Sequence, residues 1–319
     1  MLKNVPQEIN VSGNEFSVLN DVIDTLRFRG SIFFHSNLSA PWGMSLPLVS
    51  SPRFHVALEG GFHIGAGGRQ VQVKPMDIVM IPNGEMHWIA DQVGSELVAS
   101  ESAGVACDLG KPFFQQGDTT HRIMCGIVEY DEVITHPIIS ALPPVFHLSD
   151  IESDDNIWMT VKLIDAEIVR SNSKRNIIID RLSEVLFIQL LTRHVNENDH
   201  LVGFFSALRE PRFKKVLQLI HQNPQTQWSL DIIGDTVGMS RATLLRKFKA
   251  ELGVSPMMYV NNWRMAKAHQ LLKYSSLSLD DIADVIGFSG ARTFRSAFQR
   301  HYGFTPSIVR KSMLECESS

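Results

Sequence analysis

The last third of the chain contains one helix-forming segment twice, and this duplication constrains the fold more than any other feature. Residues 230–238 (LDIIGDTVG) recur 49 positions later as residues 279–287 (LDDIADVIG). The likeness then continues through Ser240, Leu244, Phe248, Gly253 and Ser255-Pro256, which correspond to Ser289, Phe294, Phe298, Gly303 and Thr305-Pro306. From the aromatic positions onward the offset is 50, so the second copy carries one extra residue after Ser289.

Each copy has the pattern of two short helices joined by a tight turn. Ser229 and Ser278 stand where an N-terminal cap is expected, and apolar residues follow at helical spacing. Gly238 and Gly287 then end the first helix of each copy, where a positive φ is favourable. The next helix has an apolar stripe and a basic face, which is typical of the recognition helix of a helix-turn-helix.

A third helix is predicted between the two copies. It starts at Ser255-Pro256, since proline suits the first helical position, and runs to about Leu272. Its length of roughly 27 Å would hold two recognition helices about 34 Å apart, one turn of duplex DNA. The alternative is a helical bundle whose basic residues are only a solvated face.

Charge is distributed unequally along the chain. Residues 205–312 hold 16 Lys and Arg against 7 Asp and Glu, whereas residues 1–204 hold 14 against 25. The overall charge of −4 therefore hides a basic module joined to an acidic one. A basic module supplies the salt-sensitive affinity for phosphates that binding to double-stranded DNA requires.

The stretch from Pro211 to Lys311 resembles the AraC/XylS family of bacterial transcription regulators. The likeness rests on residues 237–241 with Phe248-Lys249, on 253–256 with Trp263-Arg264-Met265, and on 282–289 with 294–298 and 303–306. The resemblance implies two recognition helices in adjacent major-groove segments of promoter DNA. It also implies RNA polymerase, a small-molecule effector and a second copy of the chain as partners.

The resemblance assigns DNA contacts to both recognition helices and their surroundings. The residues are Ser240, Arg241, Ala242, Thr243, Arg246, Lys249, Arg264, Ser289, Arg292, Arg295, Ser296 and Arg310. We expect Thr243 and Arg246 to read bases, and Lys249, Arg264 and Arg310 to hold phosphates. The family often has Arg where Ser296 stands, with Arg295 one position earlier here.

The first half of the chain has the pattern of short strands and turns. Strands are expected at 31–34, 54–58, 62–64, 70–73, 77–81 and 96–99, which favours a barrel or jelly roll. Residues 59–61, 76–77, 82–87, 143–144 and 147–148 resemble the cupin domains of one AraC-type branch. Helices are expected at 157–169, 180–195 and 201–208. We expect these helices to pack on the barrel and one of them to form a subunit interface.

The predicted fold is therefore α+β and multidomain. We place a cupin-like β-barrel sensor at 1–150, a helical linker or dimerisation region at 151–204, and an all-α domain with two helix-turn-helix motifs and a linker helix at 205–312. The sequence shows no run of about 18 apolar residues, no secretory start and no cysteine framework among Cys107, Cys125 and Cys316. We therefore expect a cytoplasmic protein that does not enter a membrane.

The barrel could hold a metal or a small molecule. His87 matches the second half of the cupin metal motif, but Arg53 stands where its glutamate is expected and the His-x-His pair is missing. This disfavours an enzyme and any required cofactor. His55 and His87, with His35 or His63, remain candidates for an irregular divalent-metal site. The alternative is that these histidines are hydrogen-bonded beside a pocket.

Trp42 and Trp88 join His55 and His87 as candidate effector-binding residues, although aromatic residues more often belong to the core. Cys125 is expected to be a small core residue rather than a redox sensor. Three functions stay open: a ligand-responsive regulator, a metal-binding cupin enzyme or metal sensor fused to a DNA module, and a DNA binder whose barrel only dimerises.

Overall fold

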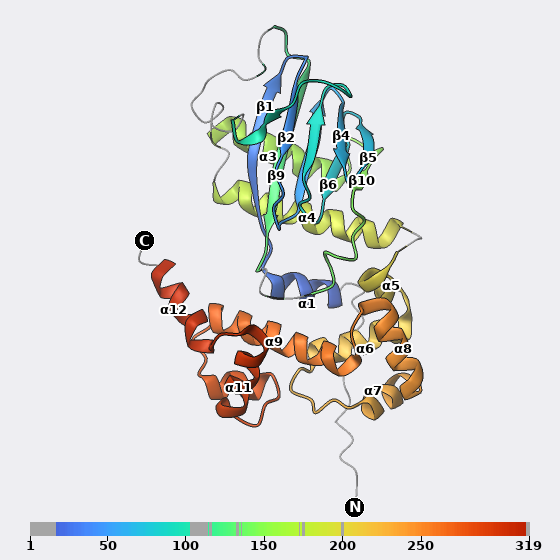
Figure 1. Cartoon of the computed structure of the whole chain (residues 1–319), viewed down its shortest axis with the longest axis vertical. Coiled ribbons are helices and arrows are strands. Elements are labelled where there is room, and N and C mark those ends of the chain that lie inside the picture. Colours follow the sequence, from blue (N-terminus) through green and yellow to red (C-terminus); the bar gives the residue numbers. More distant parts are fainter. Residues whose placement is uncertain are drawn as a thin grey trace, which may run out of the picture. The chain divides into compact units, whose positions relative to one another are not determined.

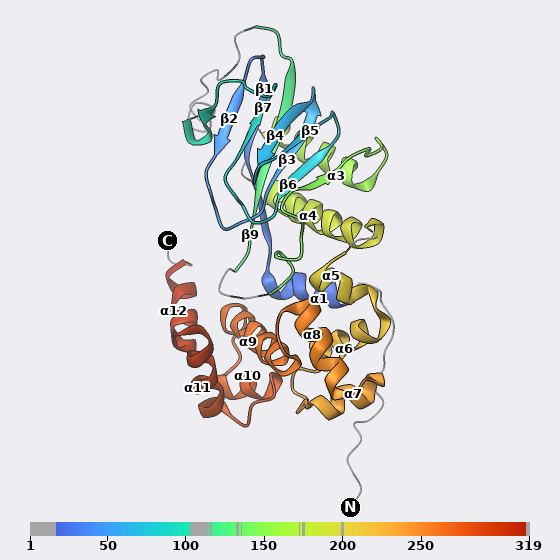
Figure 2. The same ribbon diagram turned by 45° about the vertical axis from the view of Figure 1, so that its right-hand side comes forward.

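The structure is a computed structural model. It describes residues 17–316 apart from 103–113, 115–116, 132–133, 135, 172, 174–175 and 199–200. The described residues form two compact units. One holds residues 27–207 with 249–253, and the other holds 17–26, 208–248 and 254–316. Figures 1 and 2 show the strands of the first unit and the helices of the second.

The first unit is built from two five-stranded sheets. One has the order β1 (Arg29–Leu38), β9 (His121–Glu129), β3 (Arg53–Glu59), β6 (Ile78–Ile81) and β10 (Phe146–Leu148). The other has the order β5 (Arg69–Val73), β4 (Phe62–Ala66), β7 (His87–Ala90), β2 (Gly43–Leu46) and β8 (Val98–Ala99). The strand pairs are antiparallel except for the parallel pair β2–β8. This confirms the mostly β first domain.

One apolar core lies between the two sheets. It contains Trp42, Phe62 and Cys125 together with side chains from both sheets. Alternate residues of the strands point into this core, as the two-residue period of a strand requires. The inward positions therefore decide which polar groups lie inside the barrel.

Two long helices, α3 (Asn156–Ser171) and α4 (Ile177–Glu197), cover the sheet that contains β1 and β9. Gly30 on β1 permits the close approach of α4, because a Cβ there would lie 2.5 Å from the Cβ of Ser183. Asp165 on α3 accepts from Arg122 of β9 and pairs with His35 of β1. Both helices lie where the sequence predicted them.

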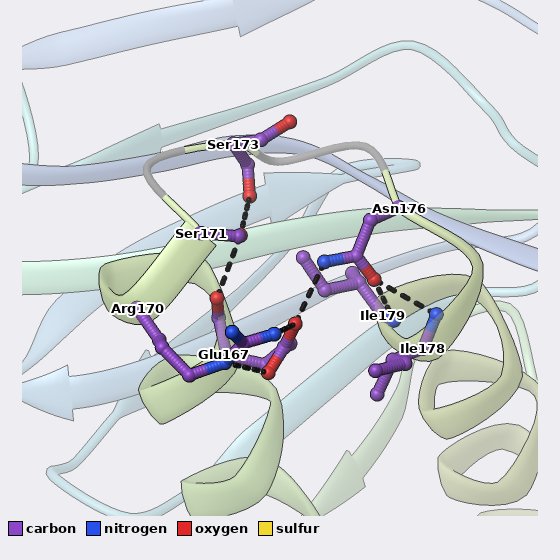
Figure 3. Close-up of polar contacts among 7 residues, drawn as sticks. All are labelled: Glu167, Arg170, Ser171, Ser173, Asn176, Ile178 and Ile179. Carbon is purple, nitrogen blue, oxygen red and sulfur yellow. Dashed lines mark hydrogen bonds and ion pairs between the residues drawn. The ribbon is translucent and has the colours of Figure 1, made fainter.

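The turn between α3 and α4 is held by its own polar groups (Figure 3). The side-chain oxygen of Asn176 accepts from the backbone N–H groups of Ile178 and Ile179, which caps α4. The amide of Asn176 donates to Glu167 near the end of α3 at 2.8 Å. Arg170 pairs with the same carboxylate. The two helices are therefore fixed to each other at this end.

The second unit is helical. Its helices are α1 (Ser17–Leu26), α6 (Pro211–Gln222), α7 (Leu230–Val237), α8 (Arg241–Leu252), α9 (Pro256–Tyr274), α10 (Leu279–Val285), α11 (Ala291–Tyr302) and α12 (Pro306–Cys316). A short helix, α5 (Gly203–Arg209), precedes α6. The duplicated segment thus forms two helix-turn-helix motifs, α7–α8 and α10–α11, joined by the predicted linker helix α9.

Local capping follows the sequence closely in both copies. Ser229 accepts from the N–H of Ile232, and Ser278 forms a capping box with Asp281. Gly238 has a φ of 65° and Gly287 a φ of 80°, the left-handed conformation that ends a helix at low cost with glycine. Within the described residues, no helix has the length and hydropathy that a membrane span needs.

Helix α1 belongs to the helical unit, whereas the sequence placed residues 1–150 together in the barrel domain. It contacts α6 and α9. The side-chain amide of Gln270 donates to the backbone oxygen of Asp24 at 3.0 Å and to its carboxylate at 2.9 Å. Sequence gave no sign of this, since the partners are 246 residues apart.

Candidate nucleic-acid interface and barrel site

The two recognition helices, α8 and α11, start in similar ways. The hydroxyl of Ser240 accepts from the N–H of Thr243 at 3.2 Å and lies 3.0 Å from the Thr243 hydroxyl. At the start of α11, the hydroxyl of Ser289, two residues before the helix, lies 3.0 Å from the hydroxyl of Thr293. Hydroxyl groups therefore line the first turn of both helices, where a recognition helix meets base edges.

Each recognition helix buries one face and exposes a basic one. Leu244 and Phe248 are buried on α8, as are Phe294 and Phe298 on α11. The residues exposed on the opposite sides are Arg241, Ala242, Arg246 and Lys249 on α8, and Arg292, Arg295, Ser296 and Arg300 on α11. Among the described residues, no hydrogen bond or ion pair holds the guanidinium of Arg246 or of Arg292. Both are therefore available to a ligand.

An aspartate of the preceding helix holds the start of each recognition helix. Asp231 forms a two-pronged ion pair with Arg241, which lowers the pKa of the Asp231 carboxyl. Asp280, the equivalent residue in the second copy, accepts from the backbone N–H of Ala291 at 3.1 Å. Arg241 was predicted to contact DNA, and it would have to exchange or share this carboxylate to do so.

Four other predicted DNA contacts already have hydrogen-bond partners within the protein. Arg264 is half-buried and donates to the carbonyls of Pro224 and Thr226. Arg310 donates to the carbonyl of Leu277, and the Ser296 hydroxyl donates to that of Arg292. Lys249 reaches the carbonyl of Gly253 at 2.9 Å but stays exposed. The geometry favours a structural role for Arg264 and Arg310 in place of phosphate binding.

The barrel brings His55 and His87 together. Their Nε2 atoms lie 2.9 Å apart, and both side chains are buried. His87 Nδ1 lies 2.6 Å from the carbonyl of Glu85, so it donates there and its Nε2 accepts from His55. Burial lowers the pKa of His87 to about 4 and that of His55 well below its usual value, so both rings are neutral.

One atom of this pair is left without a partner. The Nδ1 atom of His55 is buried and has no hydrogen-bond partner among the described residues. A neutral ring that donates through Nε2 presents Nδ1 as an acceptor. Leaving a buried acceptor unmatched costs about 1–3 kcal/mol. The site is therefore suited to a donor group from a bound molecule or a water.

Of the two tryptophans expected at this site, Trp42 lies in the barrel core and Trp88 faces away from it. Trp42 packs with Phe62 and His121 in the core, with ring centroids 6.3 and 5.5 Å away. Trp88 follows His87 along β7 and so points to the other face of the sheet, over Gly65. Strand alternation therefore corrects the expectation for Trp88 alone, and Trp42 in the core stays a candidate with a buried Nε1 that has no hydrogen-bond partner among the described residues.

The other metal-ligand candidates lie apart from the pair as well. His35 contacts Asp165 of α3, and His63 Nδ1 lies 3.3 Å from the carbonyl of Asp91. Among the described residues, no group of three or more His, Cys, Asp or Glu is arranged to hold a metal. The pair supplies two of the four protein ligands of a structural zinc site, and so does not fit such a site by itself.

Arg53 also belongs to this site. The sequence singled it out only because it stands where the cupin metal motif has a glutamate. Its side chain is buried, donates to the carbonyl of Pro47 at 2.8 Å, and lies over the Phe33 ring. Its charge lowers the pKa of both His55 and His87. A fixed cation beside the imidazoles disfavours a second cation there. Cys125 is also buried, and burial raises the pKa of its thiol, as befits a core residue.

A double helix-turn-helix with an exposed basic face, in the same chain as a cupin-like barrel, defines an AraC-type transcription regulator. Residues 17–196 match the family model described as cupin, and residues 233–312 match the model described as a helix-turn-helix domain. The chain thus belongs to the cupin family and is a DNA-binding transcription regulator of the AraC type.

Two relatives described as HTH-type transcriptional regulators are similar to this chain over nearly their whole length. The transcriptional regulator AlkR of Acinetobacter baylyi is 26% identical over 309 residues, covering 92% of this chain and 98% of that protein. The regulator MtrA of Neisseria gonorrhoeae is 25% identical over 314 residues, covering 92% and 98%. A solved AraC-type regulator from Chromobacterium violaceum is 34% identical, with a TM-score of 0.31, over 33% of this chain and 93% of that one.

Proposed function

We propose that a small molecule bound inside the barrel controls how this regulator binds its promoter. The observation that carries the proposal is the buried, unmatched Nδ1 atom of His55. An effector with a hydroxyl or N–H group would donate to it, and the surrounding apolar core would cover the rest of the molecule. The effector must bind one state of the regulator more tightly than another, since equal affinity shifts nothing.

We propose further that the barrel binds its small-molecule effector without catalysing a reaction. Arg53 occupies the sequence position of the carboxylate that a metal-dependent cupin enzyme needs, and its charge opposes a metal at His55 and His87. The competing function is a metal sensor built on this pair. Elemental analysis of the purified protein separates the two, because stoichiometric zinc, nickel or iron would contradict the proposal.

A substitution can separate the two roles of His55. In His55→Gln, the side-chain amide can still donate to His87, but the acceptor at the Nδ1 position is gone. We expect mass spectrometry to detect a bound small molecule in the purified wild-type protein. His55→Gln should melt close to the wild type but lack this molecule. His55→Ala also breaks the bond to His87, and should be destabilised by about 1–3 kcal/mol.

His147→Ala is a suitable control, because this half-exposed side chain bonds only to Asp77 among the described residues. The control should keep the small molecule. If His55→Gln also keeps it, and a promoter reporter responds as in the wild type, then His55 is a purely structural residue. In that case the effector binds elsewhere.

Two protein partners belong to this proposal. RNA polymerase is the partner through which a promoter-bound regulator acts. A second copy of the chain would explain the apolar side chains exposed on the outer helices of the barrel unit, such as Leu163 on α3 and Val185 on α4. Exposed apolar patches of this kind mark interaction surfaces.

A further inference from the structure

Helix α9 is part of the cores of both DNA-binding motifs. In its first half, Tyr259 packs against Phe248 of the first motif, and the indole N–H of Trp263 points to the carbonyl of His221. In its second half, Met265, Ala268 and Leu272 share one core with Phe294 and Phe298 of the second motif. Arg264 lies between these two halves, directly after Trp263.

Arg264 uses its guanidinium to hold the loop that precedes the first motif. Nε donates to the carbonyl of Pro224 at 2.8 Å, and Nη2 donates to that of Thr226 at 2.7 Å. The loop is ordered by its own bonds as well, since the indole of Trp228 donates to the carbonyl of Asn223 at 3.0 Å. The planar fork of an arginine holds two carbonyls in a fixed geometry, whereas an ammonium group is a point charge on a flexible stem.

The same loop contacts the turn of the second motif. The side-chain amide of Gln227 donates to the carbonyl of Gly287 at 2.9 Å. Gly287 allows this approach, because a Cβ there would lie 2.6 Å from the carbonyl oxygen of Gln225 and 2.9 Å from Nη2 of Arg264. The guanidinium also lies over the ring of Phe288, 5.9 Å from its centroid.

We call these residues, Arg264 with loop 224–227, Gly287 and Phe288, the Arg264 bracket. It gives the two motifs a second connection besides the backbone of α9, running from the loop before α7 to the turn before α11. A single helix resists bending and twisting only through its own backbone. Two connections between the two helix-turn-helix motifs fix their relative orientation more firmly than α9 alone.

We propose that Arg264 is a positioning residue that sets the separation and orientation of the two recognition helices, and thereby the spacing between half-sites that the protein accepts. Each helix must enter a major groove on one face of the duplex, and the groove returns about every 10.5 base pairs. Binding both half-sites at once multiplies affinity only when the geometry permits it. A loose connection would weaken this gain at the preferred spacing and relax the discrimination against others.

The test uses the full-length protein and a duplex operator selected from random DNA with the wild type. Affinity is measured by fluorescence anisotropy on this operator, on a derivative with one half-site scrambled, and on derivatives with two base pairs added or removed between half-sites. We expect Arg264→Ala to bind the single half-site as the wild type does. On the complete operator it should lose about tenfold, and its preference for the selected spacing should shrink.

Arg264→Lys distinguishes the bracket from a phosphate contact. The variant keeps the charge but not the fork, so we expect it to resemble Arg264→Ala. The slope of log affinity against log salt should equal that of the wild type in both variants. A phosphate contact predicts a different result: equal loss on every duplex, rescue by lysine, and a salt slope reduced by about one in the alanine variant. That result would overturn the proposal.

Gln227→Ala tests the bracket from the other side with an exposed residue, which keeps the test decisive if Arg264→Ala does not fold. We expect the same relaxed spacing preference, smaller in size, with a melting temperature close to that of the wild type. If folded Gln227→Ala and a folded Arg264 variant both keep the wild-type preference for half-site spacing, then α9 alone sets the relative orientation of the two recognition helices.

Discussion

Arg246 is the residue on α8 whose chemistry is most directly open to DNA. It is exposed and held by no hydrogen bond or ion pair among the described residues, and it lies one turn after Thr243. We expect Arg246→Ala to cost about 1–3 kcal/mol on the operator and to relax the sequence preference. Lys249→Ala should instead weaken operator and random duplexes alike, because a phosphate contact does not depend on sequence. Equal losses on both duplexes for Arg246→Ala would refute base reading by Arg246.

Sequence reasoning succeeded with residues whose role depends on their neighbours along the chain. Leu244, Phe248, Phe294 and Phe298 were expected in the core from helical spacing alone, and they are buried. Arg264 could not be assigned in this way, because the carbonyls it binds lie 40 and 38 positions earlier. A basic residue in a basic domain resembles a phosphate contact until its partners in space are known.

At the scale of helices and strands, the predictions based on strong local sequence patterns were also the correct ones. The capping residues Ser229 and Ser278 and the terminating Gly238 and Gly287 placed both helix-turn-helix motifs correctly. The strands β2 and β7 were missed, because four residues are too few to establish a period of two, whereas β6 of the same length was found from its continuous apolar run. The error at β7 had a consequence for the site, since it concealed that His87 and Trp88 face opposite ways.

The exposed faces of α3 and α4 give a prediction about assembly. Met159 and Leu163 are 49% and 56% exposed and lie one turn apart on α3. If a second copy covers this stripe, Leu163→Glu should convert a dimer into a monomer in light scattering after size exclusion. Val169→Glu is the matched control, because Val169 is 68% exposed but lies on another side of α3. A wild type that is monomeric at high concentration would contradict this dimer.

For the whole molecule, the division of charge predicts separable behaviour. A fragment of residues 205–319 contains both motifs and 16 of the 30 Lys and Arg, so it should fold as helices and bind duplex DNA. It lacks the contacts of α1 with α6 and α9, and should therefore be less stable than the whole chain. With 6–10 phosphate contacts, its affinity should fall by roughly 10³–10⁵ between 50 and 200 mM salt. A fragment of residues 27–207 is the control and should not bind. Salt-independent binding by the first fragment would be incompatible with a phosphate-driven interface.

The extra residue of the second copy, Gly290, has a consequence for the kind of operator this protein can recognise. It lies with a φ of 143° between Ser289 and the start of α11, where α8 begins directly after Ser240. The recognition positions therefore correspond with a shift of one: Ala242 matches Arg292, and Arg246 matches Ser296. The two copies thus present different side chains to the duplex at equivalent positions. The natural operator of a single chain should therefore contain two half-sites of different sequence rather than a direct repeat of one half-site.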